Sequence, residues 1–154
     1  MALHWSIYTF SELSNHQLYD ILKLRTDVFV VEQECPYPEL DNKDQDSLHF
    51  CGFNAKKELV AYTRIISPGV SYKETSIGRV LIKKSERKFK YGKILMQLSI
   101  DIAKRKYPKH NIKIGAQTYL SEFYTNLGFK QTSEPYLEDD IPHIEMIYNV
   151  KQDN

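Results

Sequence analysis

The stretch of this chain that most restricts its fold is Ile77–Gly92, which reads IGRVLIKKSERKFKYG. The apolar run 80–82 is typical of a buried strand, and it ends in a polar turn. After Gly92, apolar residues recur at helical spacing through 93–106. A strand, a basic turn with a glycine and a helix in this order predict an α/β unit that presents the helix N-terminus to a ligand.

The basic turn predicts an anion site. The first N–H groups of a helix lack intrahelical partners and carry partial positive charge. Gly92 would let a ligand come close to the backbone. The turn adds four cations, Arg87, Lys88, Lys90 and Lys93. We expect a phosphate or pyrophosphate here; a solvated basic surface is the alternative, and the GxxxxGK[ST] and GxGxxG motifs of common nucleotide sites are missing.

Size and composition exclude several classes of protein. A chain of 154 residues with 42% hydrophobic residues fits one domain over 1–154. A net charge of +1 argues against a general nucleic-acid binder. No stretch approaches the roughly 18 apolar residues of a membrane span, and the two cysteines, Cys35 and Cys51, suit a reducing compartment. We therefore expect a cytoplasmic protein with neither nucleic-acid nor membrane partners.

Periodicity along the rest of the chain predicts a mixed α/β fold. A Ser-x-x-Gln capping box at Ser14 begins the first helix, and Gly128 is placed to end a short helix. Strands are expected at 5–10, 49–53, 59–66, 77–82, 112–117 and 143–150, and helices at 14–29, 93–106 and 121–127. The order β-α-β-β-β-α-β-α-β implies a mixed sheet flanked by helices.

Two segments resemble motifs of a known family. RKFKYG, residues 87–92, is similar to the Arg/Gln-x-x-Gly-x-Gly/Ala acetyl-CoA-binding motif of the GNAT N-acetyltransferases, with Lys90 at the middle glycine. QTYLSEFYTNLGF, residues 117–129, resembles the family's Asn-x-x-Ala-x-x-Phe-Tyr-x-x-x-Gly-Phe segment. Residues 24–37 and 138–147 are similar to the ElaA-like branch, which also tolerates the lysine. Two motifs in the right order are more specific than either one.

The resemblance implies the acyl-CoA N-acyltransferase fold, with a mixed central sheet and helices on both faces. It also implies transfer of an acetyl group from acetyl-CoA to a primary amine by direct attack. The cofactor-binding residues that it implies are Val80, Leu81, Ile82, Arg87, Lys88, Phe89, Lys90, Tyr91, Gly92, Lys93, Gln117 and Tyr124. Tyr124 matches the tyrosine that protonates the departing thiolate, although plain packing is the competing interpretation for its side chain.

The general base and the acceptor pocket have several candidates. Glu32 follows the first predicted helix, where the acceptor site lies in this family, and His143 opens the last strand and titrates in a useful range. A solvated or hydrogen-bonded structural role is at least as plausible for both. Further candidates for the acceptor pocket are Phe29, Gln33, His49 and Arg64.

The sequence also offers two weaker candidates, an arginine site for an acidic acceptor and a metal site. Arg25 and Arg64 could hold an acidic acceptor group, but a surface ion pair is favoured for each. The aspartates of 41–46 lack the glycine and the final glutamate of a calcium loop. Cys35, His49 and Cys51 lack the paired spacing of a zinc site. We therefore predict no metal.

Three other functions remain open. An acyl-homoserine-lactone synthase also carries a Val-Phe pair, here Val28-Phe29, near its N-terminal helix. A non-catalytic CoA-binding sensor would share the cofactor residues. The third alternative, a partner-binding module without a cofactor, is the function that the basic loop at 87–92 favours least. Because many relatives are dimers, a homodimer is also possible, and the acceptor amine is not identified by the sequence.

Overall fold

The structure, a computed structural model, describes residues 2–150. Its strands are β1 His4–Thr9, β2 Ser47–Phe53, β3 Leu59–Ile66, β4 Ser76–Ile82, β5 Ile112–Gln117, β6 Lys130–Gln131, β7 Tyr136–Glu138 and β8 Ile141–Tyr148. Its helices are α1 Asn15–Thr26, the π-helix η2 Asp27–Glu32, α2 Gly92–Lys106 and α3 Ser121–Asn126. Short 3-10 turns are η1 Phe10–Glu12, η3 Asp44–Asp46, η4 Lys84–Phe89 and η5 Thr118–Leu120.

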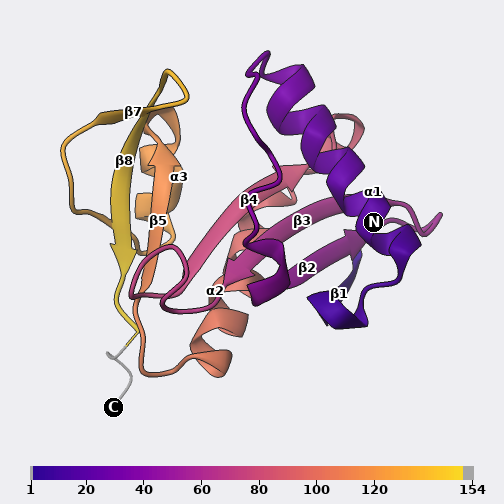
Figure 1. Ribbon diagram of the computed structural model, residues 1–154, viewed down its shortest axis with the longest axis horizontal. Helices are drawn as coiled ribbons and strands as arrows, with labels where there is room; N and C mark the ends of the chain where they lie inside the picture. The colour runs from indigo at the N-terminus through magenta and orange to yellow at the C-terminus, as the bar shows by residue number, and fades with distance from the viewer. Residues whose placement is uncertain (1, 151–154) are drawn as a thin grey trace.

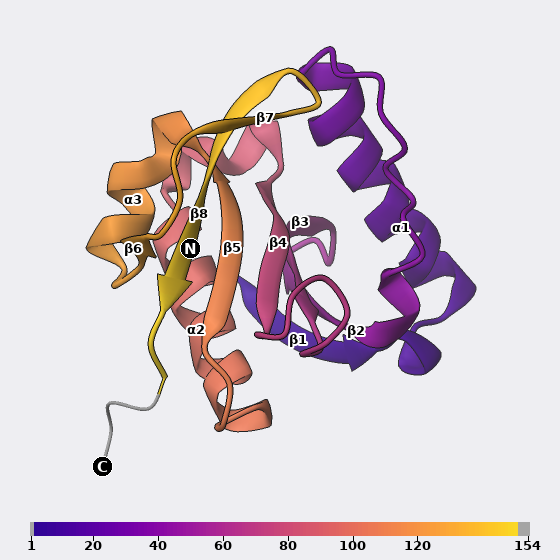
Figure 2. The same cartoon turned by 60° about the vertical axis from the view of Figure 1, so that its left-hand side comes forward.

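The strands form two antiparallel sheets that meet at one point. The first has the order β1-β2-β3-β4, and the second has β5-β8-β6, with β7 also pairing with β8. Their junction is a single parallel bridge between Thr75 and Ile112. Beyond it β4 and β5 diverge, as Figures 1 and 2 show. The expected mixed sheet is therefore split, and the split leaves room between β4 and β5.

Helices α1 and α2 cover opposite faces of the first sheet, as predicted. Along β3, Tyr62 packs with the α1 residues Ile21 and Leu24. The preceding residue, Ala61, belongs to the other cluster, which contains Leu95 and the rest of the buried face of α2. Successive side chains of a strand point to opposite faces, so this alternation follows from the strand itself. In Figure 1, α1 lies in front of the sheet and α2 behind it.

Local sequence signals place the helix ends. Ser14 Oγ accepts a hydrogen bond from Gln17 N at 3.1 Å, and the Gln17 side chain accepts one from Ser14 N at 2.9 Å. This is the predicted capping box. Gly128 ends α3 with a φ of +111°, and a Cβ on it would lie 2.9 Å from the Tyr148 ring. Both the left-handed backbone and the close ring require glycine here.

Several boundaries differ from the prediction. The first helix changes at Asp27 into the π-helix η2, which widens the backbone while the apolar spacing continues. The last strand begins at Ile141 and ends at Tyr148. The short strands β6 and β7 were not predicted, because two or three residues are too few to show a period of two. No helix within residues 2–150 is long and apolar enough to cross a membrane.

Candidate cofactor and acceptor site

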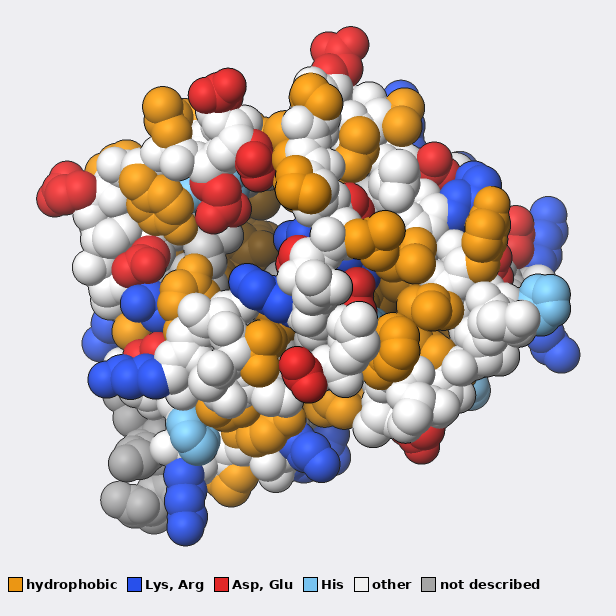
Figure 3. Space-filling view, in the orientation of Figure 1, with side chains coloured by type: hydrophobic (Ala, Val, Ile, Leu, Met, Phe, Trp, Pro, Cys, Tyr) orange, Lys and Arg blue, Asp and Glu red, His pale blue; other side chains and the backbone are white. Residues whose placement is uncertain are grey.

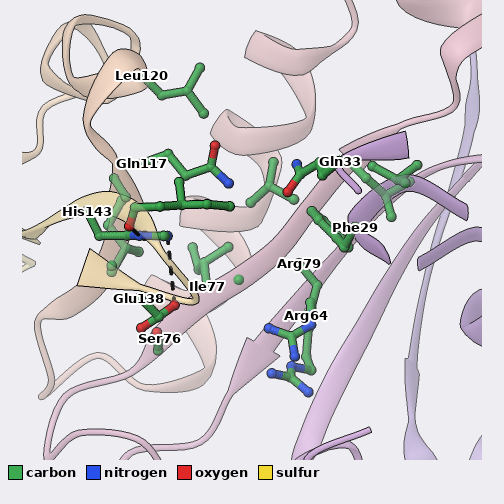
Figure 4. A pocket seen from close by; sticks show the side chains of 18 of the residues that line it. Phe29, Gln33, Arg64, Ser76, Ile77, Arg79, Gln117, Leu120, Glu138 and His143 are labelled. Atoms are coloured by element: carbon green, nitrogen blue, oxygen red, sulfur yellow. Dashed lines mark hydrogen bonds and ion pairs between the residues drawn. The ribbon is translucent and has the colours of Figure 1, made fainter. Parts of the chain in front are cut away.

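A cavity of about 630 Å³ lies where β4 and β5 diverge. This volume is within the range of small-molecule sites, roughly 300 to 1,000 Å³. Figure 3 shows the surface hollowed there, with apolar side chains at the bottom. In Figure 4, Gln117 and His143 stand on one side, Phe29 and Gln33 on the other, and Arg79 below them. The cavity is therefore bounded by both sheets and by the end of the first helical segment.

Most of the residues singled out in the sequence meet at this cavity. Those that line it are Phe29, Glu32, Gln33, Arg64, Val80, Leu81, Ile82, Arg87, Gln117, Tyr124 and His143. Those that do not are His49, Lys88, Phe89, Lys90, Tyr91, Gly92 and Lys93. The second group, apart from His49, follows Arg87 directly in the chain and runs from the end of η4 through the turn into the first residues of α2.

The turn before α2 explains the family's middle glycine. Lys90 has φ 57° and ψ 43°, the left-handed conformation that glycine adopts without steric cost. No side chain caps α2, and its first backbone hydrogen bond runs from Leu95 N to Tyr91 O at 2.9 Å. A Cβ on Gly92 would meet only Phe123 Cζ, at 4.0 Å. The chain itself therefore has space for a side chain at Gly92, next to an uncapped helix start.

Arg87 and Glu32 form a bidentate ion pair beside the cavity. Arg87 Nη1 donates to Glu32 Oε2 at 2.7 Å, and Nη2 donates to Oε1 at 3.1 Å. Arg87 Nε donates to the Ile82 carbonyl at 2.9 Å. The two side chains are 40% and 31% exposed, so solvent can reach both. The contact joins the last residue of η2 to the turn before α2.

His143 presents one ring nitrogen as a proton acceptor. Its Nδ1 lies 2.7 Å from the Ile141 carbonyl oxygen, which can only accept, so Nδ1 carries a hydrogen. In the neutral ring Nε2 then holds a lone pair. Nε2 lies 3.8 Å from a Glu138 carboxylate oxygen, the contact drawn in Figure 4, and the ring stacks on Tyr136. This geometry suits acceptance of a proton at Nε2.

Tyr124 is a buried phenol on the cavity wall. Burial raises its pKa to about 12, so the hydroxyl keeps its proton at neutral pH. Its ring makes edge contacts with Phe123 and Phe129, at 5.1 and 5.8 Å between centroids. Among residues 2–150 the hydroxyl has no hydrogen-bond partner within the protein. The ring is held by packing, and its O–H remains available to a ligand.

Beside the cavity lies a cluster of six charged residues, which we call the arginine–carboxylate cluster. Its members are Arg25, Arg64, Arg79, Glu39, Asp41 and Asp44. Arg25 is fully buried and does not line the cavity. Arg64 does line it, but donates to both oxygens of Asp41 at 2.8 Å and to Asp44 at 3.0 Å. The preference for surface ion pairs was wrong, since both arginines pair in the interior.

His49 is a structural residue in this arrangement. It is fully buried, and its Nε2 donates to the Asp44 carbonyl at 2.9 Å. Its Nδ1 then accepts from the Tyr62 hydroxyl at 2.6 Å. Burial lowers the pKa of His49, which favours the neutral ring that this pattern needs. The structure therefore gives it the task of holding the loop at Asp44, away from the acceptor pocket.

The hairpin that closes one side of the cavity was not predicted from the sequence. Asp139 and Asp140, between β7 and β8, have φ of 50° and 62°, as the two central residues of a tight hairpin turn often do. The Asp139 carbonyl lies 3.8 Å from Cys35 Sγ, beyond the end of η2, so the hairpin tip reaches the N-terminal segment. Figure 2 shows this approach. The two aspartates between short strands were the available signal.

Comparisons with known proteins agree with this geometry. Protein ElaA of Escherichia coli is 40% identical over 97% of this chain and 99% of its own length, and its crystal structure has a TM-score of 0.89. The crystal structure of an acyl-CoA N-acyltransferase from Pseudomonas aeruginosa is 37% identical, with a TM-score of 0.91 over 96% of this chain and all of that one.

More distant structures share the fold alone. A CoA-dependent acyl-homoserine lactone synthase superposes with a TM-score of 0.74 over 98% of this chain and 84% of that one, at 15% identity.

The sequence pattern of the family described as Acetyltransferase (GNAT) domain matches residues 14–150. The resemblance seen in the sequence is therefore confirmed: this chain belongs to the GNAT acetyltransferase family, among the relatives of ElaA.

Proposed function

We propose that this protein is an N-acetyltransferase that moves the acetyl group of acetyl-CoA to a primary amine of a small molecule or peptide. The acceptor attacks the thioester directly, within a ternary complex. One observation carries the proposal: a single cavity is lined by the β4 residues 80–82, by Arg87 before an uncapped helix, and by Tyr124 and His143. These groups supply the parts that direct acyl transfer needs.

The cofactor would lie along β4 and end at α2. The backbone of Val80–Ile82 would pair with the pantetheine arm. The pyrophosphate would meet Arg87 and the N–H groups of the first turn of α2, where partial positive charge favours an anion. Gly92 leaves the backbone open to that approach. Gln117 lines the cavity from the end of β5, across from this strand.

The thioester carbonyl needs backbone donors, and β4 offers them at an irregularity. Lys83 N already donates to the Val60 carbonyl at 2.7 Å, so it is not free to bind an oxyanion. The register between β3 and β4 shifts between Tyr62 and Arg64, which leaves an extra residue of β4 near Arg79 and Val80. At a β-bulge the extra residue leaves backbone N–H and C=O groups without partners on the neighbouring strand. We place the oxyanion donors at this bulge.

One side chain would accept the proton of the amine, and a second would stabilise the departing sulfur. An alkylamine, with a pKa of about 10, is mostly protonated at neutral pH and must lose a proton before attack. His143 Nε2 has the free lone pair for this step. Tyr124 donates a hydrogen bond to the departing sulfur. Since a thiolate is less basic than a phenolate of pKa about 12, Tyr124 would stabilise the sulfur as a donor more than by full proton transfer.

Thermal unfolding with saturating acetyl-CoA tests the cofactor, with NADH as a control that has an adenine nucleotide and a pyrophosphate but lacks the pantetheine arm. A ligand at about 100 times its dissociation constant adds roughly 2.7 kcal/mol, a rise of several degrees for a chain of this size. A selective rise supports the proposal, and release of free thiol across a panel of primary amines then identifies the acceptor. If acetyl-CoA causes no rise, the enzymatic proposal is rejected.

The same assays separate the competing functions. A lactone synthase would form product only with S-adenosylmethionine and an acyl donor. A CoA sensor would bind acetyl-CoA and release no thiol with any amine. Arg87→Glu would abolish cofactor binding in an enzyme or a sensor, and would have no specific effect in a partner-binding module.

A further inference from the structure

We propose that the ion pair between Arg87 and Glu32 is a switch operated by the cofactor. In the free protein Glu32 holds Arg87; the pyrophosphate of CoA takes over the guanidinium and releases the Glu32 carboxylate into the cavity. The inference rests on the proposed function, because it assumes that the diphosphate binds beside Arg87. It adds a coupling between the cofactor side and the acceptor side of one site.

The geometry of the pair is the first argument. All three guanidinium nitrogens of Arg87 are engaged, Nε by the Ile82 carbonyl and both Nη by the two oxygens of Glu32. One N–H on each Nη remains free, but these two point to opposite sides, so a diphosphate that takes the paired end-on fork of donors must displace the carboxylate. Because the pair is partly exposed, its net contribution to stability is small. A diphosphate carries more negative charge and more acceptor oxygens, so it can compete for the fork of donors.

The position of Glu32 is the second argument. It is the last residue of η2, it lines the cavity, and its neighbours in the wall are Phe29 and Gln33. Within residues 2–150 Arg87 is the only charged partner of Glu32. Once Arg87 turns to the cofactor, Glu32 becomes an unpaired carboxylate facing the cavity.

The other carboxylates of the cavity wall cannot act in this way. Asp41 is held by Arg64 and Arg79, and neither arginine belongs to the turn before α2. Glu138 is 60% exposed and faces His143. Asp139 also lines the cavity, but within the described residues it has no ion pair that the cofactor could break. Glu32 is thus the lining carboxylate whose partner the cofactor would take. A carboxylate released there attracts an ammonium group, so binding of CoA prepares the cavity for a cationic acceptor. Linkage makes the coupling reciprocal.

Calorimetric titration with CoA, at fixed ionic strength, tests the switch through the dissociation constant. Glu32→Gln removes the competitor for Arg87, so we expect CoA to bind about three to ten times more tightly. Glu34→Gln is the matched control: it removes one negative charge two residues away, from an exposed side chain that makes no ion pair within the described residues. The affinity of the Glu34→Gln variant for CoA should differ from that of the wild type by less than about twofold.

A double-mutant cycle locates the effect. Arg87→Ala should weaken CoA binding, and adding Glu32→Gln to it should change nothing further, because the competition is already gone. The switch is overturned if Glu32→Gln binds CoA no more tightly than the wild type, if Glu34→Gln gains as much, or if the gain persists without Arg87. Failure of the wild type itself to bind CoA would instead reject the proposed function, so the two failures are distinguishable.

Discussion

Arg25 and Glu39 form an ion pair in the interior, with 2.5 Å between Nε and Oε2 and side chains 0% and 6% exposed. The same guanidinium donates to Asp44 and to the Glu39 carbonyl, at 2.7 and 3.2 Å. These contacts join α1 to the segment after η2 that forms part of the cavity wall. Arg79 reaches the same Glu39 carboxylate from the bulge in β4, at 2.8 Å. One carboxylate thus connects the helix, the segment and the bulged strand.

Replacing Arg25 with methionine should be strongly destabilising. Methionine keeps an apolar stem of similar length but removes the buried cation that Glu39 and Asp44 share, which leaves Glu39 with Arg79 and Asp44 with Arg64. Breaking one partner of a buried ion pair typically lowers the free energy of unfolding by about 3 to 5 kcal/mol. Urea unfolding, followed by circular dichroism, measures the loss. Lys23→Met is the control, since its ion pair with Asp27 is well exposed and should contribute far less. Equal losses in the two variants would contradict this account of the cluster.

The arginine–carboxylate cluster should also make the folded protein less stable in acid. Burial opposes ionisation of Asp41, but hydrogen bonds and charge from Arg64 outweigh it and hold its pKa at about 2. The same balance lowers the pKa of Asp44, with Arg25 as the leading partner. Because the folded-state pKa lies below the ordinary value of 3.8, this stabilisation is complete above that pH. It is lost as the pH falls from there through the folded-state value.

Melting temperatures between pH 6 and pH 2 measure this dependence. The wild type should lose stability steeply below about pH 4, and Asp41→Asn should start lower and fall less steeply over the same interval. A variant whose melting curve runs parallel to that of the wild type below pH 4 would exclude Asp41 as a source of the acid sensitivity.

Sequence periodicity predicted the regular elements well and the polar contacts poorly. The bounds 59–66 and 112–117 match β3 and β5, because their apolar runs are flanked by turn residues. The cluster was missed because Arg25 lies in the predicted first helix, whereas Glu39 lies 14 residues further on, in a loop whose sequence shows no periodicity. Likewise, Arg87 and Glu32 were both chosen, but for separate tasks. Their contact spans 55 residues and exists only because η2 ends beside the turn before α2.

Gly92→Ala separates folding from cofactor binding. The free chain has room for the methyl group, and alanine is favoured over glycine in a helix by about 0.8 to 1 kcal/mol. The variant should therefore melt no lower than the wild type. If the pyrophosphate approaches the backbone here, the added Cβ should weaken acetyl-CoA binding by about tenfold or more. Unchanged affinity in a stable Gly92→Ala protein would move the pyrophosphate away from this turn.

Tyr124→Phe tests the donor to the departing sulfur. The ring contacts with Phe123 and Phe129 persist in phenylalanine, so the fold and the affinity for acetyl-CoA should be retained. Loss of the hydroxyl should lower turnover, on the order of 100-fold, in the thiol-release assay. Tyr19→Phe, on an exposed side chain of α1, is the control and should turn over like the wild type. Normal turnover in Tyr124→Phe would remove this hydroxyl from the chemistry.

His143→Gln distinguishes the two candidate bases. If Nε2 of His143 accepts the amine proton, the variant should lose about 100-fold or more in kcat/KM, together with the acidic limb of the pH–rate profile. Glu32→Gln should keep that limb, because a residue that only binds the acceptor does not take the amine proton. His110→Gln, exposed and outside the cavity, should match the wild type in rate and in pH profile. A pH profile that survives in His143→Gln and disappears in Glu32→Gln would reverse the assignment and make the carboxylate the base.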